Sequence, residues 1–225
     1  MKIEYFPTQK YNTIVIDPPW DISMAGKRKL RKSLSKELPY KTMTIKEIED
    51  LPIESICNEG THVYLWATNK TLEMAFDIFR KWNINFHLVL VWVKPSMLAP
   101  SFGYMFATEF CLLGYYKKAT QRHLKMGVKN WFEEQNKPHT HSKKPDQFYK
   151  LVADMSPEPR IDIFARIGRK GWDVFGDEIP ICPKCKNILI ESDLKEYSFL
   201  CERCDENFYS IEVVAKKSEI ERLKQ

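Results

Sequence analysis

The stretch IVIDPPW, residues 14–20, decides how the rest of the chain is interpreted. Its first part is apolar and rich in β-branched residues, which is typical of a buried strand. The strand then stops at Asp17, two prolines and Trp20. Because proline has no N–H and a fixed φ, Pro18 and Pro19 end the hydrogen-bond ladder of a sheet abruptly. The sequence therefore predicts that an acidic and an aromatic side chain lie together at a strand end.

Length and composition indicate a globular protein with one large core and a small appendage. The chain has 225 residues, of which 44% are hydrophobic and 29% are charged, and these proportions are usual for soluble domains. It has no apolar stretch long enough to span a membrane, and residues 1–10 lack the apolar core of a signal peptide. We therefore expect a cytoplasmic protein without a membrane partner.

Segments with strand patterns and segments with helix patterns alternate along the chain. Strands are expected at 13–16, 62–67, 86–93, 109–115 and 161–165, and helices at 44–57, 71–82 and 145–155. Thr44 and Glu47 have the spacing of a capping box at the first helix. The alternation predicts an α/β fold with a mostly parallel sheet covered on both faces. Such sheets bind ligands at the carboxyl ends of their strands, where Asp17 would lie.

The groups that follow the first strand suit an amine on a flat heterocycle. We expect the Asp17 carboxylate and the backbone carbonyls of Asp17 and Pro18 to be free to accept protons from the amine, while the ring stacks on Trp20. Drawing the N–H protons toward acceptors reduces delocalisation of the nitrogen lone pair into the ring, so the amine becomes nucleophilic. The alternative is that the prolines merely end the strand and Trp20 packs in the core.

Six further blocks make the chain resemble a known enzyme family. DPPW at 17–20 resembles the catalytic motif of amino-methyltransferases that modify adenine N6. The other blocks stand in the family's order: LPYKTM at 38–43, LWATN at 65–69, VWVK at 91–94, HSKKPDQFY at 141–149, SPEPRIDIFAR at 156–166 and GWDVFGDE at 171–178. The chain is thus similar to the family that contains the catalytic subunit of the messenger-RNA adenosine methyltransferase. The resemblance implies a Rossmann-like sheet that uses S-adenosylmethionine and has a permuted motif order.

The resemblance also implies roles for individual residues. Asp17, Pro18, Pro19 and Trp20 would form the catalytic motif: Asp17 and the Pro18 carbonyl would hold N6, Trp20 would stack on the base, and Tyr40 would line the base pocket. A second set would bind the cofactor, namely Asp17, Lys94, Arg166, Asp177 and Glu178. The family often has Asn where this chain has Asp177. The alternative for Tyr40 is that it packs in the core, and the alternative for Lys94 is that it is only an exposed residue at a strand end. Since no G-x-G-x-x-G pattern is present, Gly168 and Gly171 are the candidates for a close approach to the cofactor.

Basic residues are concentrated between Trp20 and Tyr40. The net charge is +5, and this short segment holds Lys27, Arg28, Lys29, Arg31 and Lys32. Such a run predicts a nucleic-acid partner whose phosphates it contacts, and a solvated charged face is the alternative. We favour DNA over RNA because the chain is compact and has no other RNA-binding module.

Four cysteines after Pro180 form a C-x2-C-x15-C-x2-C pattern: Cys182, Cys185, Cys201 and Cys204. This spacing is typical of a structural zinc site, and a redox role for one pair is the alternative. We expect an adenine-N6 methyltransferase domain over 1–180, a zinc ribbon over 181–212 that needs its metal to fold, and a charged tail over 213–225. Because the sheet carries its own core, loss of Cys201 is expected to spare S-adenosylmethionine binding.

Two functions stay open from the sequence. The favoured one is an enzyme that transfers a methyl group from S-adenosylmethionine to the N6 amine of adenine in nucleic acid. The other is a catalytically silent nucleic-acid-binding subunit with the same fold. Silent relatives tend to lose the acid or the aromatic residue of the motif, and this chain has both Asp17 and Trp20. Both a homodimer and a heterodimer with a related subunit are compatible with the sequence.

Overall fold

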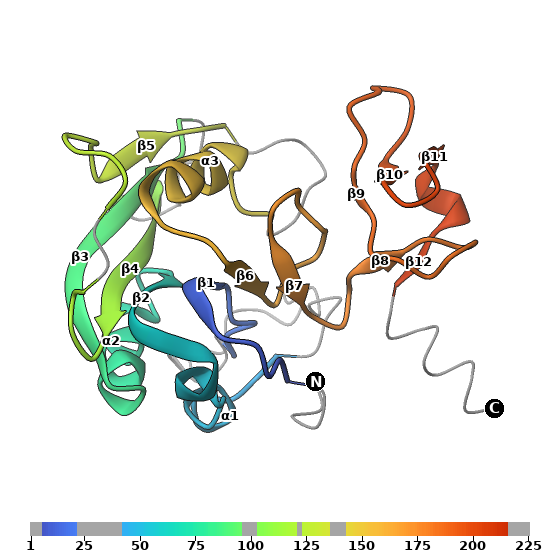
Figure 1. The fold of residues 1–225 in the computed structure, drawn as a ribbon. Helices are drawn as coiled ribbons and strands as arrows, with labels where there is room; N and C mark the ends of the chain where they lie inside the picture. Colours follow the sequence, from blue (N-terminus) through green and yellow to red (C-terminus); the bar gives the residue numbers. More distant parts are fainter. Residues whose placement is uncertain (1–5, 22–41, 96–102, 121–122, 136–142, 216–225) are drawn as a thin grey trace.

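The computed structural model describes residues 6–21, 42–95, 103–120, 123–135 and 143–215. Its centre is a seven-stranded sheet with the order β5–β3–β4–β2–β1–β6–β7 (Figure 1). The strands are β1 (Tyr11–Ile16), β2 (Cys57–Ala67), β3 (Ile84–Val93), β4 (Thr108–Tyr116), β5 (Trp131–Glu133), β6 (Arg160–Ile163) and β7 (Asp173–Phe175). Strand β4 runs antiparallel to both of its neighbours, and the other pairings in this sheet are parallel. The prediction of a mostly parallel sheet is confirmed.

Helices cover the sheet on both faces. Helices α1 (Ile45–Glu49) and α2 (Leu72–Lys81) pack on one face, and α3 (Asp146–Met155) packs on the other. Side chains alternate along β1 accordingly: Ile14 and Ile16 belong to the core beneath α1 and α2, while Val15 belongs to the core beneath α3. The central position of β1 between β2 and β6 explains why its run is apolar on both sides. The predicted α/β fold is confirmed and is consistent with a Rossmann-like methyltransferase sheet.

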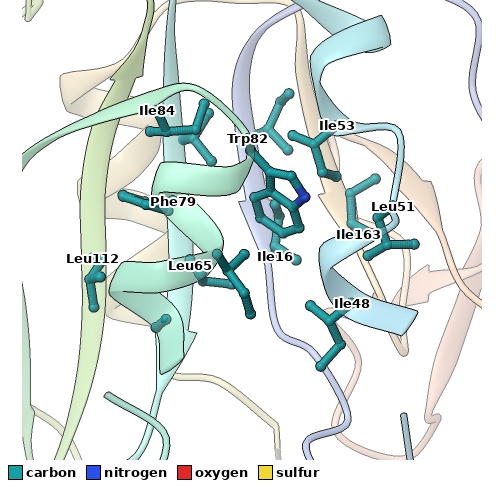
Figure 2. Close-up of a cluster of buried hydrophobic side chains, with 14 of the residues drawn as sticks. Ile16, Ile48, Leu51, Ile53, Leu65, Phe79, Trp82, Ile84, Leu112 and Ile163 are labelled. Atoms are coloured by element: carbon teal, nitrogen blue, oxygen red, sulfur yellow. The ribbon is translucent and has the colours of Figure 1, made fainter. Parts of the chain in front are cut away.

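The core beneath α1 and α2 is built around Trp82 (Figure 2). Trp82 directly follows α2 and is 2% exposed. Its indole Nε1 donates a hydrogen bond to the carbonyl of Glu49, the last residue of α1, at 2.9 Å. Ile48 and Phe79 bring apolar side chains from the two helices into the same cluster. Trp82 thus links α1 to α2 and packs both helices on the sheet face that Ile14 and Ile16 of β1 share.

The helix expected over 44–57 is wrong in its length. The capping box of Thr44 and Glu47 is present, but α1 ends at Glu49. A 3₁₀ turn follows over Ile53–Ile56, and β2 then begins at Cys57. The cause is Pro52, which has no N–H to donate and disfavours the helical conformation of the residue before it.

The chain after β7 forms small antiparallel pieces. Strands β9 (Ile190–Glu191), β10 (Phe199–Cys201) and β11 (Glu206–Phe208) make one sheet, and β8 (Pro180–Ile181) pairs with β12 (Val214–Ala215). A 3₁₀ turn, Ser210–Glu212, precedes β12. This region has its own small buried cluster, made of Cys182, Leu189, Cys201 and Phe208. Among the residues that the structure describes, no helix is long and apolar enough to cross a membrane.

Candidate active site

The residues after β1 form a tight turn at the carboxyl end of this central strand. The N–H of Asp17 donates to the carbonyl of Ile163 on β6 at 3.3 Å, and the N–H of Trp20 donates to the Pro18 carbonyl at 2.8 Å. The Pro18 carbonyl is therefore partly engaged, because the turn uses one of its two lone pairs, and its contact with N6 stays a prediction. The Asp17 side chain remains 22% exposed. The carboxylate is thus the more accessible acceptor of the two groups.

A chain of alternating charges leads from Asp17 across the sheet. Lys144 Nζ lies 3.0 Å from Asp17 Oδ1 and 3.1 Å from Glu109 Oε2. The other carboxylate oxygen of Glu109 pairs with Lys94. Lys144 is only 11% exposed, and its ammonium group also lies over the ring of Trp66, 5.0 Å from the ring centroid. These contacts fix the Asp17 carboxylate through a buried cation.

Burial and neighbouring charges shift the pKa values in this chain. Burial raises the pKa of Asp17 above its ordinary value even though Lys144 opposes the shift. Burial disfavours the charged form of Lys144, but Asp17 and Glu109 outweigh it and raise its pKa. Burial also acts to raise the pKa of Glu109, yet Lys144 and Lys94 together hold it below its ordinary value. Lys144 and Glu109 are therefore charged at neutral pH, and Asp17 is more basic than an exposed aspartate.

Asp17 lies on the wall of a pocket that the segment 164–169 also lines, and Asp162 is buried against this pocket. Asp162 Oδ2 accepts a hydrogen bond from the hydroxyl of Tyr149 at 2.8 Å. Its Oδ1 is buried without a hydrogen-bond partner among the described residues. Burial raises the pKa of Asp162 to about 7, although Tyr149 and Arg169 act against the shift. The pocket therefore contains an acceptor that a ligand with a donor group would satisfy.

The predicted cofactor residues lie in two places. Arg166 lines the pocket, and its Nε is 3.6 Å from Glu178 Oε2. Asp177 and Glu178 follow β7, next to the strand that carries Asp162. Lys94 follows β3 and is joined to Asp17 only through Glu109 and Lys144 in the contacts described above. The structure therefore brings Asp17 and Arg166 to one pocket, and Lys94 is the last member of the charged chain, away from Asp17.

Trp20 is packed into the core in this structure. It is 7% exposed and belongs to the cluster beneath α1 and α2. Its Nε1 donates to the carbonyl of Trp66 at 3.0 Å. The packing agrees with the alternative of a core residue, and stacking on a base stays a prediction. Of the other expected substrate contacts, Tyr40 and the basic run Lys27, Arg28, Lys29, Arg31 and Lys32 lie outside the described residues.

The four predicted metal ligands come together in the C-terminal region. All four Sγ atoms, of Cys182, Cys185, Cys201 and Cys204, lie within 4.8 Å of one another. Two of the separations are 4.0 Å and 3.5 Å, whereas sulfurs on a tetrahedral zinc with Zn–S of about 2.3 Å are about 3.8 Å apart. Each pair is followed by a residue with positive φ, Lys186 at 61° and Asp205 at 52°. The cluster has the donor set and the spacing for a tetrahedral metal ion.

Comparison with known proteins identifies the family of the sheet domain. The MT-A70 family matches residues 11–178, which include both β1 and the segment 164–169. The chain belongs to the MT-A70 family. The cysteine cluster lies beyond the matched residues, so it is an addition to the part that defines the family.

Relatives of this MT-A70 chain are named as methyltransferases. It is 26% identical to the putative N(6)-adenosine-methyltransferase MT-A70-like of Medicago truncatula and 25% identical to the N(6)-adenosine-methyltransferase subunit METTL3 of Danio rerio, each over 76% of the chain. It spans only 26% and 28% of those proteins. It is also 27% identical to the type II methyltransferase M.MunI of a Mycoplasma species, over 77% of the chain and 80% of that protein. These names give no support to the alternative of a catalytically silent subunit.

Four residues of this MT-A70 site had no predicted role. Lys144 and Tyr149 stood inside the quoted block at 141–149, and Asp162 stood inside the block at 156–166, but none was given a role. A signal was present for Asp162, because an acid within a buried strand is rare unless it is paired. Glu109 offered a weaker signal as an acid at the start of an apolar strand.

Proposed function

We propose that this protein is an S-adenosylmethionine-dependent methyltransferase that acts on the N6 amine of adenine, with DNA favoured over RNA as the polymer. The observation that carries the proposal is the accessible Asp17 carboxylate, held by Lys144 at the end of the central strand and beside a pocket. Membership of the MT-A70 family and the names of the relatives support the reaction class.

The pocket fits the polar groups of S-adenosylmethionine. That molecule carries an ammonium group, ribose hydroxyls and a carboxylate, and Asp162 Oδ1 is a buried acceptor that lacks a donor among the described residues. Arg166 brings a cation to the same pocket. Asp162 would therefore accept from a donor of the cofactor, and Arg166 would face its carboxylate. When bound, S-adenosylmethionine supplies a methyl group activated by a sulfonium centre.

Asp17 would position and activate the amine. Its carboxylate accepts an N–H of N6, which orients the nitrogen lone pair toward the methyl group and increases its electron density. S-adenosylmethionine would supply the methyl group to the nitrogen and leave as a neutral thioether, and the amine would then give up one proton. Asp17 is suited to take this proton, because burial raises its pKa above that of an exposed aspartate. Lys144 keeps the carboxylate in place during the exchange.

The preference for DNA is supported by the match to a type II methyltransferase, which covers 80% of that protein. The basic run of residues 27–32 supports a polyanionic partner. A second subunit, identical or related, is a further part of the proposal, because one relative is named as a subunit.

We also propose that the four cysteines hold a structural zinc ion. Four thiolates complete a tetrahedral shell and leave no open position for catalysis. Their small cluster contains few apolar side chains besides Leu189 and Phe208, so a metal would supply much of the stability of this region.

The test is a methylation assay on DNA and RNA oligonucleotides that contain adenine, read by mass spectrometry of the nucleosides. Asp17→Ala is expected to lower turnover by about 100-fold or more while S-adenosylmethionine binding falls less. Asp154→Ala is the matched control, because this exposed aspartate only pairs with Lys125 at the surface. Wild-type turnover in Asp17→Ala would refute the role of the carboxylate. Methylation of RNA alone would overturn the preference for DNA.

A further inference from the structure

A glycine makes a backbone contact between the cysteine region and the pocket wall. Gly168 lies between Ile167 and Arg169, and both of these residues line the pocket. The N–H of Gly168 donates to the carbonyl of Leu189 at 3.0 Å, and Gly168 forms an isolated β-bridge with Ile190. The segment 164–169 thus lines the pocket, and through Gly168 it is also bonded to Leu189 and Ile190, where β9 starts.

Leu189 connects this bond to the metal ligands. Its side chain is fully buried in the same cluster as Cys182 and Cys201. Its N–H donates to the carbonyl of Pro180 at 3.0 Å, so its backbone is held from both sides. A movement of the cysteines would displace the Leu189 side chain, and with it the carbonyl that Gly168 contacts.

The contact has no spare room. A Cβ atom at Gly168 would lie 2.7 Å from Ile188 Cγ2 and 2.7 Å from the Leu189 carbonyl oxygen. Such distances are too short for any side chain, so the glycine is needed for space here. A second link lies nearby: Lys143, which lines the pocket, donates to Glu191 Oε2 at 2.5 Å. Lys143 of the pocket lining and Gly168, which lies between two lining residues, are therefore bonded to residues 189–191.

The charge of the cysteine region argues against a role in binding phosphates. Residues 181–212 contain four basic and seven acidic side chains, a net charge of −3. Four thiolates on one divalent metal would add a further negative charge of about −2. A polyanion is repelled by such a surface. The net charge therefore gives no support to a role of this region in docking nucleic acid.

We propose that metal binding by the four cysteines positions the pocket wall 164–169, so that the metal and S-adenosylmethionine bind cooperatively. The inference rests on the proposed function for the ligand of the pocket and for the metal at the four cysteines. The metal acts through Leu189 and Gly168, and residues 188–191 are the positioning element. Metal and cofactor would each raise the affinity of the other by the same factor, about 5- to 150-fold for coupled sites of ordinary strength.

The first experiment compares the zinc-loaded and the chelator-treated full-length protein. Removal of zinc is expected to raise amide hydrogen exchange in 164–169, to leave β4 protected, and to weaken S-adenosylmethionine binding in calorimetry by about 5- to 150-fold. Saturating S-adenosylmethionine should tighten zinc binding, measured by competition with a chelator, by the same factor. Unchanged exchange in 164–169 together with unchanged cofactor affinity would overturn the proposal.

Two glutamate variants test the second link without removing the metal. Glu191→Gln breaks the ion pair with Lys143, whereas Glu206→Gln breaks the pair of Glu206 with Lys184, which lies within the cysteine region. Glu191→Gln is expected to weaken cofactor binding by about 2- to 5-fold, as is usual for a partly exposed ion pair, and Glu206→Gln to leave it unchanged. Equal effects of the two variants would contradict the link. If the wild-type protein bound no S-adenosylmethionine, the proposed function would fail, and hydrogen exchange in 164–169 would still decide whether metal and pocket wall are coupled.

Discussion

Substitution of Lys144 by methionine tests whether the charged chain holds Asp17. Methionine keeps most of the side-chain volume and removes the ammonium group that lies 3.0 Å from Asp17 and 3.1 Å from Glu109. At an effective dielectric constant of about 20, each of these contacts is worth roughly 5 kcal/mol of attraction. Part of this attraction only offsets the burial of Lys144 itself. The net loss in the free energy of unfolding is therefore expected to be about 3–5 kcal/mol at pH 8.

The pH dependence distinguishes lost charge pairing from lost packing. Without Lys144, the folded-state pKa of Asp17 rises further and that of Glu109 is no longer held down to the same degree, so both carboxyls take up protons more readily in the folded state. The difference in stability between wild type and variant should then shrink as the pH falls through these pKa values, and it should be largest above them. Urea unfolding at pH 8 and at pH 5 measures it. A loss that is the same at both pH values would refute the electrostatic reasoning. Lys125→Met, which removes an exposed pair with Asp154, is the control and should cost about 1 kcal/mol or less.

Two further predictions concern buried residues of the site. Trp20→Ala should lower the free energy of unfolding by about 3–5 kcal/mol, because a buried indole is lost, and Trp20→Phe should lose less; an unchanged urea midpoint in Trp20→Ala would show that the ring serves only the ligand. Asp162 has a pKa raised from 3.8 to about 7, so the folded state keeps a proton that the unfolded state releases, and stability falls as the pH rises through this interval. Asp162→Asn lacks this titration. Between about pH 5.5 and about pH 8, the free energy of unfolding of the wild type, measured with urea, should therefore fall by about 2 kcal/mol relative to that of the variant. Parallel pH profiles of the two proteins would contradict the raised pKa.

The sequence predicted those features that local patterns determine. The apolar run before Asp17 identified β1, and the spacing of Thr44 and Glu47 identified the start of α1, because each depends on neighbours within a few positions. The charged chain was not predictable in the same way. Lys144 meets Glu109 only because the chain before α3 returns to the start of β4, and no local pattern fixes that approach. The bond to the Pro18 carbonyl was unpredictable for a similar reason, since the turn that makes it depends on the position of Trp20.

Gly168 is a close-contact position, as the sequence indicated, and the neighbours that the structure shows there belong to the cysteine region. The sequence marked it as a place where the cofactor would approach the backbone, because a glycine after a strand often serves that purpose. In the structure, the space beside its Cα is filled by Ile188 and Leu189 of the cysteine region. The expectation that loss of Cys201 would spare cofactor binding assumed that the sheet domain and the cysteine region share no contact. Gly168 makes a contact between them. Since Leu189 packs against Cys201 and also accepts the bond from Gly168, the physical argument now favours a loss of cofactor affinity when the metal is removed.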